Sequence, residues 1–282
     1  MNPKIVSLIS AAGGVGKTTI AVLLGWFLKE RNKKTLLIDM DPSLGLTLNL
    51  FDFADYKRDL EDHNKTSADF LESTLKTDKL RKFDFNHVIS TAFFQKYKLD
   101  LIASSIRLET VMGSIWYNPT SGHREKKLKE ALGYIPPKFN YDYIIIDSIP
   151  CYAIVYAMTT LYASDVCIIP LRLTRNDLGR TISMIKKLQE DMENVEVNED
   201  DFYNKLLFVF NRVNTQYSYD DKVPRYIDEI RKAMPKAQFF DKFIGQQAGF
   251  PRIGTSEEKS DDAKKVKKAF EPFFEDFMEK IG

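Results

Sequence analysis

The chain has 282 residues, of which 44% are hydrophobic and 29% charged, and its formal net charge at pH 7 is +1. This length and composition predict one soluble α/β domain over residues 1–282. The small net charge excludes nucleic-acid binding driven by bulk charge, so any such contact needs a local basic patch. No apolar run approaches the ~20 residues of a membrane-spanning helix, and the first residues lack the apolar core of a signal peptide.

The first element is an apolar run over residues 5–9, which predicts a buried strand. The next ten residues, Ser10 to Thr19, read Ser-Ala-Ala-Gly-Gly-Val-Gly-Lys-Thr-Thr. A strand, a glycine-rich turn and a helix opening with Lys-Thr-Thr are the layout of a phosphate-binding loop, because small residues let backbone N–H groups approach phosphate oxygens. Lys17 would neutralise charge on the β- and γ-phosphates, and the Thr18 hydroxyl would contact Mg²⁺. A glycine-rich turn without a ligand is the alternative. The predicted nucleotide contacts are Gly13, Gly14, Val15, Gly16, Lys17, Thr18 and Thr19.

The loop from Gly13 to Thr19 resembles the deviant Walker A loop of the ParA/MinD superfamily of partition and positioning ATPases. That family carries Lys-Gly-Gly-x-Gly-Lys-Thr, and its first lysine, the signature lysine, reaches across a dimer to the partner's nucleotide. Ala12 stands at that position here. Another cation would have to replace the lysine, and Arg172 and Arg175, which follow a later strand, are our candidates. Otherwise the chain binds nucleotide without turnover, or the alanine is an engineered change.

Residues 35–41 form a second buried-strand pattern, which ends in two carboxylates before Pro42. The pattern resembles the Asp-x-Asp-Pro switch of the same family. The resemblance implies that Asp41 lies beside the γ-phosphate and helps to order Mg²⁺ and the attacking water. A strand-end cap and turn at Asp41 and Pro42 is the alternative.

The middle of the chain is less regular. Helical patterns cover residues 18–29, 67–75 and 124–132, a strand pattern covers 99–105, and the charged stretch 51–66 predicts a mobile excursion. Residues 141–147 then predict a buried strand that ends at Asp147 and resembles a Walker B strand. Asp147 would hold Mg²⁺ through a bound water.

Two further strand patterns, 163–170 and 206–213, flank a helix over 177–192 and are followed by an expected helix over 226–234. Asn211 lies near the end of the second strand, where the resemblance implies contact with the adenine edge; a simple turn residue is the alternative. Alternating strands and helices predict a doubly wound, mostly parallel sheet with the phosphate-binding loop after its first strand. The nucleotide then binds at the carboxyl ends of the strands. Cys151 and Cys167 are expected to be buried, reduced thiols of a cytosolic protein.

Two basic clusters follow the Walker B region. Each would either solvate a helix face or contribute to a DNA-backbone patch. The apolar residues of the last helix predict packing on the sheet. A MinD-like membrane helix is the rival, disfavoured because four acidic residues would repel anionic lipid. The clusters are Arg172, Arg175, Arg180, Lys186 and Lys187, and Lys264, Lys265, Lys267 and Lys268.

Taken together, the resemblance implies an ATP- and Mg²⁺-dependent homodimerisation switch with slow ATP hydrolysis. It further implies binding to nonspecific DNA, stimulation by an adaptor protein, and positioning of a plasmid, chromosome locus or protein body in the nucleoid region of the cytoplasm. The carboxysome-positioning members, which also lack the signature lysine, are a suspected subgroup. A MinD-like membrane regulator and a pseudo-ATPase are the alternatives. An iron–sulfur carrier is excluded because the chain has no Cys-x-x-Cys motif.

Overall fold

A computed structural model describes residues 2–75, 77–91, 98–118, 122–214, 219–253, 255 and 257–282. These residues form a nine-stranded sheet with the order β3-β4-β2-β5-β1-β6-β7-β8, and β9 pairs with β7. Its pairs are parallel except β3 with β4. The predicted doubly wound, mostly parallel α/β fold is therefore confirmed. The strands are β1 (Lys4–Leu8), β2 (Thr35–Asp39), β3 (Ser90–Thr91), β4 (Asp100–Ile102), β5 (Tyr143–Asp147), β6 (Val166–Leu171), β7 (Leu206–Val213), β8 (Gln238–Phe239) and β9 (Ile244–Gly245).

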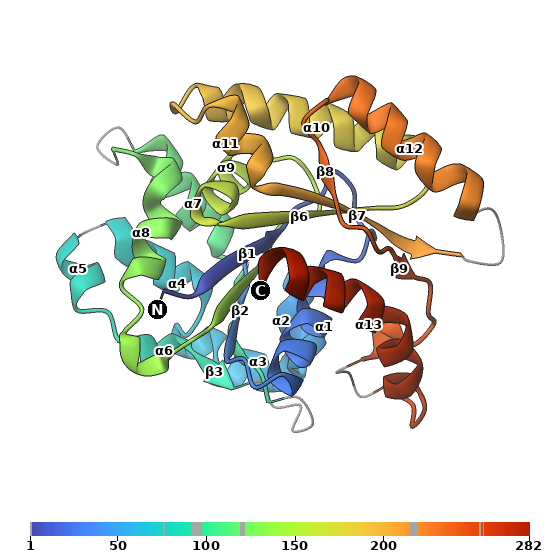
Figure 1. Cartoon of the computed structure of the whole chain (residues 1–282). Helices are drawn as coiled ribbons and strands as arrows, with labels where there is room; N and C mark the ends of the chain where they lie inside the picture. The colour runs from blue at the N-terminus through green and yellow to red at the C-terminus, as the bar shows by residue number, and fades with distance from the viewer. Residues whose placement is uncertain are drawn as a thin grey trace.

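Helices cover both faces of the sheet. Figure 1 shows α9 to α12 above it and α1, α2 and α13 below it. The α-helices are α1 (Lys17–Glu30), α2 (Gly45–Leu50), α3 (Phe53–Asp59), α4 (Ser67–Glu72), α5 (Thr77–Arg81), α6 (Phe85–Val88), α7 (Leu108–Tyr117), α8 (Lys127–Gly133), α9 (Ile154–Ala163), α10 (Arg175–Glu193), α11 (Glu199–Asn204), α12 (Tyr219–Ala233) and α13 (Asp262–Ile281). Short 3₁₀ turns are η1 (Glu61–His63), η2 (Ser73–Leu75), η3 (Arg124–Lys126), η4 (Pro137–Phe139) and η5 (Phe250–Arg252).

The two faces of the sheet carry separate hydrophobic cores. Successive side chains of a strand point to opposite faces. In β5, Ile144 and Ile146 therefore join the core that α9, α10 and α12 also line, whereas Tyr143 and Ile145 join the core that α1 and α13 line. A strand covered by helices on both faces is apolar along most of its length, which explains why residues 143–146 of β5 lack the alternation of a half-exposed strand.

Helix α13 packs against α1 through aromatic rings. The Phe27 ring of α1 lies 5.1 Å from both the Phe270 and Phe274 rings, measured between centroids. Phe273 and Phe277 are also fully buried. The expected packing of the last helix is confirmed, and its apolar face is unavailable to a lipid surface. No helix among the described residues is long and apolar enough to cross a membrane.

Two sequence expectations need correction. The stretch 51–66, predicted to be a mobile excursion, has secondary structure, because it contains α3 and η1, and the buried Tyr56 attaches it to the rest of the fold; its mobility stays a prediction. Cys151 is exposed rather than buried, since it follows β5 beyond the edge of the sheet, whereas Cys167 within β6 is buried as expected. Both cysteines are free thiols.

Candidate functional site

The loop between β1 and α1 has the backbone conformation that its glycines allow. Gly14 and Gly16 have φ angles of +71° and +95°, which L side chains rarely adopt. At Gly16 a Cβ atom would also lie 2.3 Å from Nδ2 of Asn211. The loop therefore needs glycine at this position for both conformational and steric reasons.

Lys17, the first residue of α1, points back over this loop. Its side chain is almost completely buried, and its Nζ donates to the Ser10 hydroxyl at 2.9 Å. Burial lowers the pKa of Lys17, and the carboxylates of Asp147 and Asp41 partly offset this effect. A buried ammonium with these neighbours is suited to an anionic ligand such as a phosphate group.

Thr18 and Asp147 meet beside Lys17, although 129 positions separate them in the chain. The Thr18 hydroxyl donates to Oδ2 of Asp147 at 2.6 Å, while the buried Oδ1 of Asp147 has no hydrogen-bond partner among the residues that the structure describes. Burial raises the pKa of Asp147 to about 6. An unpartnered buried carboxylate oxygen beside a hydroxyl fits a hard cation such as Mg²⁺. Among the described residues no group of three His, Cys, Asp or Glu side chains could hold a metal, so phosphate oxygens would have to supply further ligands.

Asp39, at the end of β2, is a functional residue that the sequence reasoning did not assign. Its fully buried carboxylate accepts hydrogen bonds from the backbone N–H of Asp41 and from both the N–H and the hydroxyl of Thr47. Burial and the charge of Asp147, its neighbour across the β2–β5 pair, raise the pKa of Asp39 to about 7. Asp39 therefore anchors both ends of the 41–47 segment. The signal that could have revealed it is a carboxylate within an otherwise apolar, buried strand.

Asp41 itself is only partly buried. Its Oδ1 accepts from the backbone N–H of Ser43 at 2.8 Å, and its charge acts on both Lys17 and Asp147. The structure thus brings the four predicted side chains of Lys17, Thr18, Asp41 and Asp147 together at the carboxyl ends of β1, β2 and β5.

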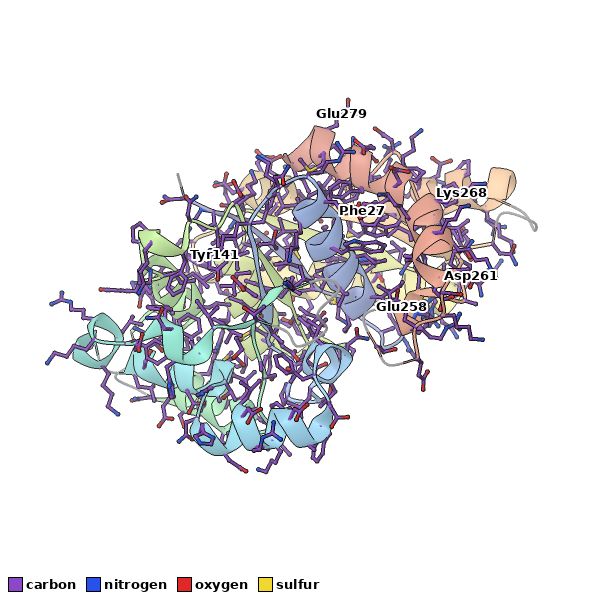
Figure 2. All side chains as sticks on the ribbon, turned by 90° about the horizontal axis from the view of Figure 1, so that it is seen from below. Phe27, Tyr141, Glu258, Asp261, Lys268 and Glu279 are labelled. Carbon is purple, nitrogen blue, oxygen red and sulfur yellow. The ribbon has the colours of Figure 1, made fainter. Side chains whose placement is uncertain are left out.

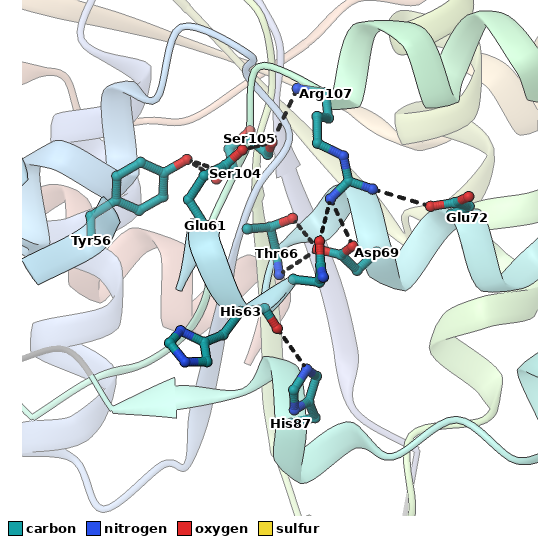
Figure 3. Close-up of polar contacts among 11 residues, drawn as sticks. Tyr56, Glu61, His63, Thr66, Asp69, Glu72, His87, Ser104, Ser105 and Arg107 are labelled. Atoms are coloured by element: carbon teal, nitrogen blue, oxygen red, sulfur yellow. Dashed lines mark hydrogen bonds and ion pairs between the residues drawn. The ribbon is translucent and has the colours of Figure 1, made fainter. Parts of the chain in front are cut away.

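A polar network continues from Thr47 away from the loop, and Figure 3 shows its part from Tyr56 to Arg107. The Thr47 hydroxyl accepts from the backbone N–H of Ser104, and the Ser104 carbonyl accepts from the Tyr56 hydroxyl at 3.1 Å. Tyr56 also donates to Glu61, which accepts a second bond from the Ser105 hydroxyl. The network ties α2, α3 and the end of β4 into one unit, and it explains why the 51–66 stretch is folded.

Arg107 is the last residue of this network. Its backbone N–H donates to the Ser105 hydroxyl, and its guanidinium contacts Asn64, Asp69 and Glu72 at 3.0–3.2 Å. Arg107 is therefore committed to pairing within its own chain.

The Asn211 side chain does not face an open base pocket. Its Nδ2 donates to the Val15 carbonyl of the loop at 2.6 Å, and its Oδ1 accepts from the N–H of Arg212. Asn211 therefore supports the phosphate-binding loop, and contact with an adenine edge stays a prediction that requires this amide to turn.

The two candidates for a replacement cation differ. The Arg172 guanidinium pairs in bidentate fashion with the buried Asp177, at 2.5 and 3.1 Å, so it is already neutralised within its own chain. Arg172 would have to leave this pair to act as the replacement cation, so its role stays a prediction. Arg175 is exposed at the start of α10, and no ion pair to it is found among the described residues. Ala12 is 6% exposed.

The basic clusters are also partly neutralised. Lys187 pairs with Glu190 and Asp191, Lys265 with Asp261 and Lys267 with Glu30. In the described part of the chain, the cluster residues without an ion pair are Arg175, Arg180, Lys186, Lys264 and Lys268.

The parallel sheet, the loop at its carboxyl edge, the buried Lys17 and the Thr18–Asp147 pair define a P-loop nucleotide-binding protein. A family model described as an AAA domain matches residues 3–198. The chain belongs to the ParA/MinD superfamily of deviant Walker A ATPases.

Individual relatives agree with this assignment. The chain is 30% identical to an uncharacterised protein of Methanocaldococcus jannaschii, over 82% of this chain and 80% of that protein. It is 34% identical to the sporulation initiation inhibitor protein Soj of Bacillus subtilis, over 60% of this chain and 58% of Soj, which is less than two thirds of Soj.

Solved structures share the fold. Apo McdA from Cyanothece superposes with a TM-score of 0.75 at 22% identity, covering 99% of both chains. A plasmid partition protein of Borrelia burgdorferi bound to AMPPNP superposes with a TM-score of 0.69 at 23% identity, covering all of both chains.

Proposed function

We propose that this protein is an ATP-dependent dimerisation switch that positions or segregates a cargo. One observation carries the proposal: the Thr18 hydroxyl bonds one oxygen of the buried Asp147, whose other oxygen is unpartnered in the described part of the chain, directly beside the buried Lys17. Backbone N–H groups of residues 13–19 and the Lys17 ammonium would bind the phosphates of ATP. Thr18 and Asp147 would hold Mg²⁺, which supplies neutralising charge on the phosphate oxygens.

The Asp41 side chain would order the water that attacks the γ-phosphate. Asp39 would act as a positioning residue, because it holds the backbone on both sides of that segment through Asp41 and Thr47. Hydrolysis is proposed to be slow and to be stimulated by an adaptor protein.

Apolar surface beside the loop supports a second copy of the chain as the partner. Four large apolar side chains are exposed in segments that follow β2, β4 and β5, at the same edge of the sheet as the loop. They are Leu48 (40% exposed), Phe53 (61%), Ile106 (72%) and Ile154 (38%). Burying such surface in a dimer is favourable. ATP enclosed between two copies would make this burial dependent on nucleotide.

Nonspecific DNA is the proposed surface on which the dimer acts, in the nucleoid region of the cytoplasm. Four exposed cations of the two basic clusters that have no ion pair in the described part of the chain, Arg175, Arg180, Lys186 and Lys264, are the proposed contacts with DNA phosphates. A MinD-like membrane role has less support, because the apolar face of α13 is buried. The cargo remains a plasmid, a chromosome locus or a protein body, including the carboxysome-type cargo of the suspected subgroup.

A pseudo-ATPase is the second candidate, and Ala12 favours it. Without the signature lysine, turnover requires another cation, and Arg175 is the stronger candidate because Arg172 pairs with Asp177.

The proposal is tested by Lys17→Ala, with Lys29→Ala in the last turn of the same helix as the control. Lys17→Ala should abolish ATP binding measured by calorimetry, and with it ATP-dependent dimerisation in sedimentation. Lys29→Ala should leave both unchanged. ATP binding of unchanged affinity in Lys17→Ala would show that the loop assignment is wrong. DNA binding should require ATP and weaken steeply with salt; equal binding with ADP and ATP would contradict the switch.

A further inference from the structure

Apart from the site at the phosphate-binding loop, a second pocket lies between β9 and α13. It has a volume of about 660 Å³ and is bounded by the ends of β7 and β9 and by one face of α13. Three lysines line it, Lys242, Lys265 and Lys268, and none of its described lining residues is acidic. A pocket of this volume is in the range of sites for small ligands.

The helical spacing of α13 explains why lysines gather there. Lys265, Lys268, Ala269 and Pro272 all line the pocket, and positions i, i+3, i+4 and i+7 share one face of a helix. The opposite face carries the buried phenylalanines. Figure 2 labels Lys268 on this helix, with Asp261 nearer its start.

Only one of the three ammonium groups has an ion partner in the described residues. Lys265 pairs with Asp261 at 2.5 Å, whereas none is found there for Lys242 or Lys268. The backbone N–H of Lys242 donates to Asp276, which anchors the residue and leaves its side chain exposed. The pocket therefore presents uncompensated positive charge, which favours an anionic ligand.

The remaining lining groups suit more than an inorganic anion. Gln246 and Gln247 bring two carboxamides, which can both donate and accept hydrogen bonds. Pro272 has no N–H, so the carbonyl of Lys268, four residues earlier, lacks its helical donor and is an additional acceptor. Phe243 and Val213 add apolar surface. The lysines suit a phosphate group, the carboxamides suit the polar edge of a base or ribose, and the apolar side chains suit the face of a base. These three parts occur together in a nucleoside phosphate.

This pocket and the small cavity beside the phosphate-binding loop are lined by neighbouring residues of the same strand pair. Asn211 of β7 pairs with Ile244 of β9, and both line the small cavity at Gly16. The next partners, Val213 and Gly245, line the second pocket instead. Because Asn211 bonds the Val15 carbonyl of the loop, a ligand that shifts β9 would act on the loop through this pair.

We propose that this pocket binds a small nucleoside phosphate as an effector, separately from the nucleotide of the P-loop. Duplex DNA shares the phosphate chemistry, but its backbone is convex and contacts protruding cations rather than the inside of a pocket. The phosphate would contact Lys242 and Lys268, and the base or ribose would contact Gln246, Gln247 and Phe243.

Calorimetry on the full chain saturated with ADP and Mg²⁺ tests the proposal. AMP, GMP and inorganic pyrophosphate are titrated in turn, and a short DNA duplex is titrated in a parallel arm. We expect a nucleoside monophosphate to bind, and Lys242→Gln or Lys268→Gln to weaken it by about tenfold or more through loss of a charge-assisted contact. Lys264→Gln, an exposed lysine of the same helix outside the pocket, should change the affinity by less than about twofold.

Four results would overturn the proposal. The first is that neither monophosphate binds at about 1 mM, and the second is that a monophosphate competes with ADP. The third is that Lys268→Gln and Lys264→Gln change the monophosphate affinity equally. The fourth is that Lys242→Gln or Lys268→Gln weakens DNA binding but leaves monophosphate binding unchanged. Lys17→Ala separates this test from the function proposed above. Lys17→Ala changes the P-loop and not the pocket, so monophosphate binding measured in this variant reports on the pocket whether or not the P-loop assignment is correct.

Discussion

Asp147→Asn should stabilise the ligand-free protein while removing its proposed Mg²⁺ site. Burial raises the pKa of Asp147 from 3.8 to about 6. The folded-state pKa thus lies above the unfolded one, so ionisation of this carboxyl opposes folding. The contribution of this one carboxyl to the free energy of unfolding is therefore greatest at acid pH and is lost as the pH rises from about 4 to about 6. Asparagine resembles the neutral carboxyl, and its side-chain oxygen can still accept the hydrogen bond from the Thr18 hydroxyl.

The expected effect follows from the two pKa values. A difference of about 2.2 pKa units corresponds to about 3 kcal/mol in the free energy of unfolding at pH 8. The same linkage relation predicts a smaller gain at pH 5 and little gain at pH 4. Relief of the repulsion between Asp147 and Asp39 acts in the same direction at neutral pH.

Urea unfolding of the apo protein at these three pH values measures the effect. Asp228→Asn, at an exposed position of α12, is the control and should change the free energy of unfolding by less than about 0.5 kcal/mol at each pH. An Asp147→Asn protein that is no more stable than the parent at pH 8, or whose gain does not depend on pH, would refute the reasoning. Loss of Mg²⁺-dependent ATP binding in the stabilised variant would support the assigned role, since functional sites often oppose stability.

Three further predictions concern turnover, dimerisation and the core. Asp41→Ala should keep ATP binding but stall hydrolysis and accumulate dimer; normal phosphate release would remove Asp41 from the mechanism. Ala12→Lys should strengthen ATP-dependent dimerisation in sedimentation by about 1.5–3 kcal/mol if no cation replaces the signature lysine. If the chain with Ala12 already dimerises with ATP and Ala12→Lys strengthens the dimer little, another cation replaces the signature lysine. Loss of the dimer in Arg175→Ala would identify that cation as Arg175. Phe270→Ala should destabilise the protein by about 3–5 kcal/mol in urea unfolding, because this fully buried ring contacts Phe27; the exposed Glu271→Ala is its control, and an equal effect of the two would contradict the packing.

Local sequence alone determined much of the fold and the loop. The strands β7 and β5 begin with continuous apolar runs, 206–210 and 143–146, because a strand covered by helices on both faces has no solvent side. Gly14 and Gly16 predicted the loop, because the positive φ angles it requires exclude most other residues. These properties depend on neighbours within a few positions, so a pattern in one segment is sufficient to predict them.

Tertiary structure alone decided which side chains are available for function. The Arg172 guanidinium pairs with Asp177, and the Asn211 amide donates to the Val15 carbonyl. Asp39 accepts a hydrogen bond from the Thr47 hydroxyl. The folding of 51–66 likewise depends on Tyr56 reaching Ser104, 48 positions away. Composition indicates the charge and polarity of such groups, but their hydrogen-bond partners are set by how strands and helices far apart in the chain pack together. For this reason the sequence predicted which chemical groups line the site, whereas only the fold determined which of them face a ligand.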